Sequence, residues 1–132
     1  MAITEINSMV INSNNHELST YKMMNDASAD ETTSDVLDVR NAEGITLLVE
    51  SGVGVNAGVV TLEGAISSAY AGEWVSLGTV TTSAASTAYA CSVSPSANPE
   101  SNAAGLPMPY VRARISTVIG VGTVDVYIVV KK

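Results

Sequence analysis

Apolar and polar residues alternate most regularly in the last part of the chain. Every second residue is apolar from Val111 to Ile115 and again from Val124 to Val130. A period of two is typical of a β-strand with one face in the core and the other toward solvent. The two runs are joined by the glycine-containing stretch Gly120–Gly122, which predicts an antiparallel hairpin.

The outer face of this hairpin would carry Arg112 and Arg114 on one strand and Asp125 on the other. An exposed ion pair across two strands contributes less than about 1 kcal/mol. The arginines are therefore better candidates for fixing the strand register, or for contact with another subunit, than for catalysis.

Shorter alternating stretches upstream repeat this pattern, with turns roughly every 8–12 residues. They cover residues 35–40, 45–52, 59–64, 73–82 and 86–93, and the polar loop Ser94–Pro109 follows them with all four prolines. Many short strands separated by turns predict an all-β fold, an antiparallel, jelly-roll-like β-sandwich over residues 35–132. The residues expected on its inner faces are Leu37, Val39, Leu47, Val49, Val60, Leu62, Val111, Ile115, Val126 and Ile128.

Residues 1–34 differ from the rest, because they are polar and show no sustained period. They predict an N-terminal arm in front of the sandwich domain, in which residues 17–24 fit a short helical turn. The alternative is that Ile3–Ile11 forms the first strand of the sandwich. A polar arm cannot by itself offset an ordering cost of about 1–2 kcal/mol per residue, so we expect it to be ordered by contact with a partner chain. The side chains expected to make that contact are Ile3, Ile6, Met9, Ile11, Tyr21, Met23 and Met24.

Composition restricts the class of partner. Hydrophobic residues make up 46% of the chain, but no run of about 18 uninterrupted apolar residues occurs, so no membrane span is expected. Thirteen acidic against six basic residues give a net charge of −7, which argues against nucleic-acid binding, since phosphates are neutralised by cations. The chain starts without a basic region and an apolar core, and its single cysteine excludes an internal disulfide. We therefore expect synthesis in a reducing cytoplasm.

Residue types that carry catalysis are few and scattered. His16, the only histidine, lies in the polar arm, and Cys91, the only cysteine, lies in an alternating strand where a buried, inert thiol is expected. One cysteine and one histidine are too few for a zinc site. Glu50, Glu63 and Glu73 could supply a carboxylate pair for sugar hydrolysis, but they occupy strand ends or exposed alternate positions, where solvated carboxylates are expected. We therefore expect no catalytic residue, no metal and no cofactor.

The single tryptophan, Trp74, has two interpretations. As the largest apolar side chain of an alternating strand, it is expected to anchor the core. As an exposed ring beside Tyr70 and the loop Ser94–Pro109, it would be the platform of a carbohydrate-binding or adhesin module.

Three stretches share a pattern with a known class of proteins. They are the lead-in TSDVLDVRNAEGITLLVESG, the segment GVVTLEGAISSAYAGEWVSLGTVTT and the C-terminal PYVRARISTVIGVGTVDVYIVV. Together they resemble small β-sandwich proteins of tailed-bacteriophage virions, especially head decoration (cement) proteins. In that class a strand ending in Leu-Glu-Gly is followed by Trp-Val-x-Leu-Gly, and later by Val-Arg-Ala-Arg.

The resemblance implies a non-enzymatic virion protein, made in the host cytoplasm, that binds the exterior of the capsid. Its partner would be the major capsid protein, whose neighbouring subunits it bridges and stabilises, without nucleic acid or membrane. It implies a homo-oligomer, with a trimer as first choice, and makes Arg112 and Arg114 candidate contact residues. The alternatives are a carbohydrate-binding or adhesin module and another virion part, such as a head fibre base or a tail component.

Overall fold

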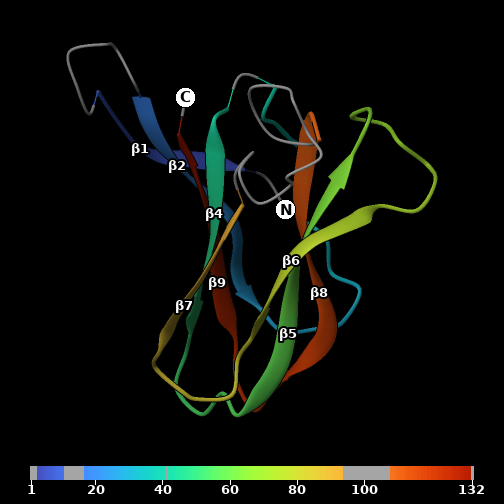
Figure 1. The fold of residues 1–132 in the computed structure, drawn as a ribbon. Coiled ribbons are helices and arrows are strands. Elements are labelled where there is room, and N and C mark those ends of the chain that lie inside the picture. Colours follow the sequence, from blue (N-terminus) through green and yellow to red (C-terminus); the bar gives the residue numbers. More distant parts are fainter. Residues whose placement is uncertain (1–2, 11–16, 41, 94–107, 132) are drawn as a thin grey trace.

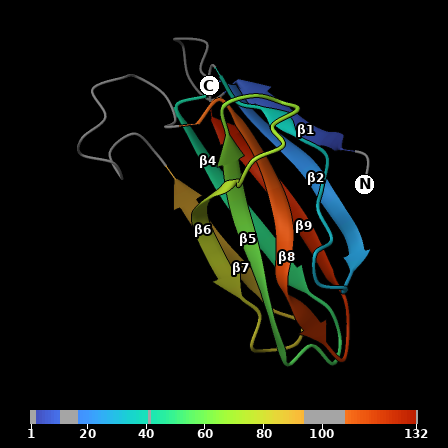
Figure 2. The same cartoon turned by 90° about the vertical axis from the view of Figure 1, so that its right-hand side faces the viewer.

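The computed structural model describes residues 3–10, 17–40, 42–93 and 108–131, and in these residues the chain is all-β. One sheet has five strands in the order β1-β2-β9-β4-β7, and the other has four in the order β3-β8-β5-β6. The two sheets lie face to face (Figures 1 and 2), which confirms the all-β antiparallel sandwich, while its jelly-roll-like character stays a prediction. The strands are β1 (Thr4–Val10), β2 (Glu17–Ala27), β3 (Leu37–Asp38), β4 (Gly44–Ser51), β5 (Ala57–Ala65), β6 (Val75–Thr81), β7 (Ala88–Val93), β8 (Tyr110–Gly120) and β9 (Val124–Lys131).

The core lies between the sheets and is aliphatic. Nine of the ten residues predicted for the inner faces are buried in it, and the tenth, Leu37, packs against it. The alternation of apolar and polar residues in β4, β8 and β9 appears directly as alternation of buried and less buried side chains. The described residues contain no helix long and apolar enough to cross a membrane.

The prediction of a C-terminal hairpin is wrong. β8 pairs with β5 and β3, whereas β9 pairs with β2 and β4. The chain therefore crosses from one sheet to the other between Gly120 and Val124. Alternation shows that a strand has one buried face, but both sheets bury one face against the same core, so the pattern does not tell which sheet a strand joins.

The prediction of a helical turn over residues 17–24 is also wrong, because these residues belong to the long strand β2. β2 lies between β1 and β9. Its register with β9 shifts between Lys22 and Met24 and again between Met24 and Ala27. A bulge breaks the strict alternation of faces, and the neighbouring residues Met23 and Met24 are both buried in the core, at 0% and 1% exposure.

The loops β4–β5 and β8–β9 pack against each other at one end of the sandwich. A Cβ on Gly54 (φ +86°) would lie 2.8 Å from the carbonyl oxygen of Val121, and a Cβ on Gly122 would lie 2.8 Å from that of Val53. Both positions thus need the absence of a side chain. Val53 and Val121 point outward, with 87% and 74% exposure, and Val121 itself has a positive φ of 62°.

We expect Val121→Asn to raise the free energy of unfolding by about 1 kcal/mol, because a β-branched residue is strained at positive φ and Asn tolerates it. The valine side chain is exposed, so little packing is lost. Urea unfolding measures the difference. Val118→Asn is the control, since Val118 is also exposed, at 53%, but lies in β8 without a positive φ. If Val118→Asn raises the free energy of unfolding as much as Val121→Asn does, relief of backbone strain is not the cause.

Candidate functional site

A charged cluster lies on the outer face of the four-stranded sheet, where β5 and β8 run side by side. Glu63 of β5 is the register partner of Arg112. Arg112 Nε donates to Glu63 Oε1 and Arg114 Nε donates to Glu63 Oε2, both at 3.0 Å. One carboxylate thus binds two guanidinium groups that are two residues apart on the neighbouring strand.

The prediction that Glu63 is a solvated carboxylate is wrong, since the residue is only 5% exposed. A buried charge is tolerated when it is paired and hydrogen-bonded. The second positive charge is balanced by Glu31, whose Oε1 accepts a bond from Arg114 Nη1 at 2.9 Å. The backbone of Glu31 donates to the carbonyl of Ile115 at 2.8 Å and holds this segment beside β8. The bond to Glu63 raises the pKa of Arg114, which therefore stays charged throughout the neutral range.

Trp74 covers this cluster. The guanidinium carbon of Arg112 lies 4.2 Å from the centroid of the indole ring, a cation–π geometry. Trp74 Nε1 donates to the carbonyl of Tyr70 at 3.2 Å, so the ring is also fixed to the β5–β6 loop. The expectation that Trp74 anchors the core is wrong, because the ring is half-buried and packs on the outer face of the sheet instead.

Exposed apolar side chains accompany Trp74. Ile66 is 69% exposed, Tyr70 36% and Val75 48%. They lie on or beside the loop 66–74 between β5 and β6, which projects from the sandwich (Figure 1). We call Ile66, Tyr70, Trp74, Val75 and Arg112 the Trp74 surface.

The charged groups of this cluster bind one another. Both oxygens of Glu63 accept bonds from arginines, so this carboxylate is held in place between two guanidinium groups. Tryptophan, tyrosine and arginine are the side chains that contribute most to protein interfaces. The ion pair of Arg112 with Glu63 holds the guanidinium group beneath the Trp74 ring.

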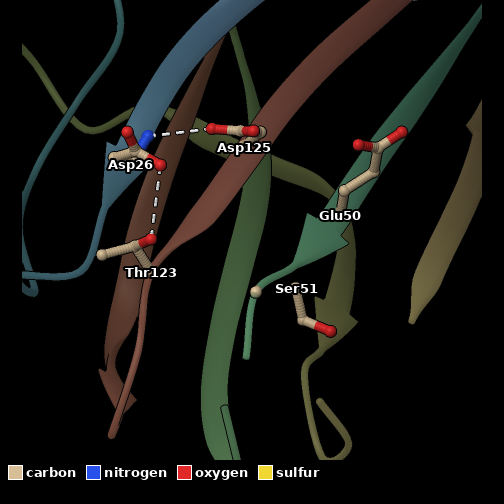
Figure 3. A pocket seen from close by; sticks show the side chains of 6 residues that line it. Asp26, Glu50, Ser51, Thr123 and Asp125 are labelled. Carbon is tan, nitrogen blue, oxygen red and sulfur yellow. Dashed lines mark hydrogen bonds between the residues drawn. The ribbon is translucent and has the colours of Figure 1, made fainter. Parts of the chain in front are cut away.

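A small pocket lies where β2 and β4 end and β9 begins (Figure 3). It has a volume of about 100 Å³ and is lined by Asp26, Glu50, Ser51, Gly52, Thr123 and Asp125. Asp26 N donates to Asp125 Oδ1 at 2.9 Å, and Lys22 Nζ lies 3.9 Å from the other oxygen of Asp125. Ligand pockets usually measure about 300–1,000 Å³, so this one is too small for a sugar or a nucleotide. In the described part of the chain, no group of three His, Cys, Asp or Glu could hold a metal ion.

The predicted contact residues are dispersed. Ile3 and Tyr21 are partly buried against the core, and Ile6 and Met9 lie on β1 with side chains outside the description. Ile11, His16 and residues 94–107 of the loop Ser94–Pro109 lie outside the described residues. Met23 and Met24 must be corrected, since they are buried in the core of their own chain and present no side chain to a partner. Arg112 and Arg114 are brought together on Glu63, with Trp74 above.

Sequence reasoning missed Glu31 and the role of Glu63. The alternation placed Glu63 on the outward-facing side of one strand and the two arginines on the outward-facing side of another. This was the signal that could have indicated an ion pair. The sequence does not show that these two strands are neighbours.

Comparisons with known proteins inform the fold. No protein-family model and no curated protein matches the sequence. The fold is similar to that of the K1 cleaved adhesin domain of Lys-gingipain (Kgp) from Porphyromonas gingivalis W83, with 14% sequence identity and a TM-score of 0.55 over 93% of this chain and 78% of that chain. At this identity the similarity concerns the fold alone.

Proposed function

We propose that this chain is a non-enzymatic binding protein that uses the Trp74 surface to contact its partner, and that it is a head decoration protein of a tailed bacteriophage. One observation carries the proposal. The motif residues Glu63, Trp74 and Arg112 come from three separate positions in the sequence and meet in one cluster on the sheet surface. This clustering supports the proposal, because residues of the pattern that resembles decoration proteins lie together at the surface of one sheet.

The mechanism we propose is stabilisation by linkage. A protein that binds the assembled capsid, but not its separated subunits, stabilises the assembly by mass action. Several weak contacts made by an oligomer around a symmetry axis add avidity. The partner in this proposal is the major capsid protein on the outside of the particle, and the oligomer is a homo-oligomer.

We expect Trp74→Ala to weaken binding to purified expanded capsids of the phage that encodes the chain by at least about tenfold, the effect of removing a binding hot spot. Co-sedimentation with capsids measures binding. Val53→Ala is the matched control, because Val53 is exposed at the other end of the sandwich, and its binding should stay unchanged. Equal binding by Trp74→Ala, with its circular dichroism unaltered, would contradict the use of the Trp74 surface.

A second candidate is a carbohydrate-binding or adhesin module. Two aromatic residues of one loop favour it, because aromatic faces stack on sugars: the indole nitrogen of Trp74 donates to the backbone carbonyl of Tyr70. A glycan array distinguishes the two. Glycan binding that Trp74→Ala abolishes, together with no capsid binding, would replace the decoration proposal. Cryo-electron microscopy of the native particle separates decoration from a head fibre base or a tail component.

A further inference from the structure

The edges of the two sheets differ in how well they are protected against pairing with another strand. In the part of the chain that the structure describes, the edge strands are β1 and β7 in one sheet and β3 and β6 in the other. β1 carries Glu5 and a register shift between Glu5 and Asn7. β3 is two residues long, and β6 has a register shift beside Leu62 of β5. Charges, bulges and short length are the devices that keep edge strands from pairing.

β7 has none of these devices. Its sequence, AYACSV, contains no charge and no proline, and it pairs with β4 over six consecutive residues without a register shift. The side chains that face outward from it, Ala88, Ala90 and Ser92, are small and exposed. Nothing in the side chains of β7 thus prevents another strand from approaching.

The backbone groups on the free edge of β7 can be assigned. Ser51 N donates to the carbonyl of Thr87 at 2.9 Å, so Thr87 directs its backbone groups toward β4. In an antiparallel ladder the direction alternates from residue to residue. Tyr89, Cys91 and Val93 therefore also face β4, while the N–H and C=O of Ala88, Ala90 and Ser92 face away from the sheet. The close hydroxyl contact of Ser92 with Thr46 of β4, at 2.9 Å, agrees, since side chains approach most closely where the backbones do not bond.

We propose that β7 pairs antiparallel with β7 of a second copy of this chain, about a two-fold axis through Ala90. The edge is self-complementary, because each of its three outward residues offers one donor and one acceptor. With Ala90 on the axis, Ala88 lies opposite Ser92 of the second copy, and all these groups are satisfied. Each chain carries a net charge of −7, so two copies repel each other. The absence of charge on β7 avoids additional repulsion at the edge where they would meet. This pairing does not depend on the proposed capsid function, and it gives a dimer where the resemblance implied a trimer.

Ala90→Pro tests the pairing without touching the ladder inside the chain, because it removes an N–H that faces away from the sheet, and proline is tolerated on such an edge. In sedimentation equilibrium we expect the wild-type mass to approach twice that of the chain as concentration rises, and the dimer dissociation constant of Ala90→Pro to increase at least tenfold. Ala90→Thr keeps the N–H and should dimerise as the wild type does. If Ala90→Pro does not fold, Ala90→Lys takes its place, and its dimer dissociation constant is expected to increase by the same factor.

A disulfide provides an independent test. The Cα atoms of a bonded antiparallel pair are about 5.5 Å apart, within the range that a disulfide spans. The double variant Ala90→Cys, Cys91→Ser should therefore form a covalent dimer under mild oxidation, whereas Ser67→Cys, Cys91→Ser, with its thiol on the exposed β5–β6 loop, should not. A wild-type protein that stays monomeric at all concentrations, a trimer, or a dimer that Ala90→Pro and Ala90→Lys leave intact would each overturn the proposal.

Discussion

Deletion of residues 1–34 is expected to abolish cooperative folding of the chain. The deletion removes β1 and β2, and β2 covers one whole side of β9. It also removes Met23, Met24 and Ala27 from the core. Circular dichroism and thermal unfolding measure the result. A truncated chain that unfolds cooperatively at the wild-type temperature would show instead that the segment is an anchor for a partner.

A single buried side chain of β2 tests the same expectation that residues 1–34 belong to the folded core. Met23→Ala is expected to lower the free energy of unfolding by about 2–5 kcal/mol, the range for removing a large buried side chain. Ile66→Ala is the control, since Ile66 is 69% exposed, and its effect should stay within about 0.5 kcal/mol. Equal small effects at both positions would mean that Met23 is not in the core.

Removal of the Glu63 carboxylate is expected to cause the next largest decrease in the free energy of unfolding. Glu63→Ala leaves Arg112 and Arg114 facing each other without their shared acceptor. Breaking a buried ion pair by removing one partner costs about 3–5 kcal/mol. The arginine side chains are 24% and 26% exposed, so solvent screens part of this effect and we expect about 2–4 kcal/mol. Urea unfolding measures it.

The control for Glu63 is the other carboxylate on the same arginine. Glu31→Gln removes the charge of a side chain that is 72% exposed, and an exposed pair is worth about 0–1 kcal/mol. Glu63→Gln, which keeps the shape, should fall between Glu31→Gln and Glu63→Ala. If Glu63→Gln and Glu31→Gln cost the same, the burial of Glu63 has no energetic consequence.

The sequence predicted the strands after residue 35 well because their buried faces follow a strict period of two. Leu47, Val49, Val126 and Ile128 lie where alternation placed them. β2 was missed because its bulges put Met23 and Met24 in the core together, which removes the period. Arg112, Arg114 and Trp74 were named from the sequence, but the role of Glu63 beside them was missed for a different reason. The pairing of Glu63 with Arg112 depends on β5 and β8 being neighbours, and neighbourhood in a sheet is set by how the whole chain packs.

The pairing of β2 with β9 also determines when the molecule can fold during its synthesis. This ladder joins Leu18 to Lys131, and β9 is the last of the strands that the structure describes. At about 5–20 residues per second, the ribosome completes β2 several seconds before β9 exists. Until then β4 and β7 can pair with each other, and so can β5 and β6, but β2 has only β1 beside it. Because contacts between distant residues slow folding, the native state is reached late, when β9 enters between β2 and β4.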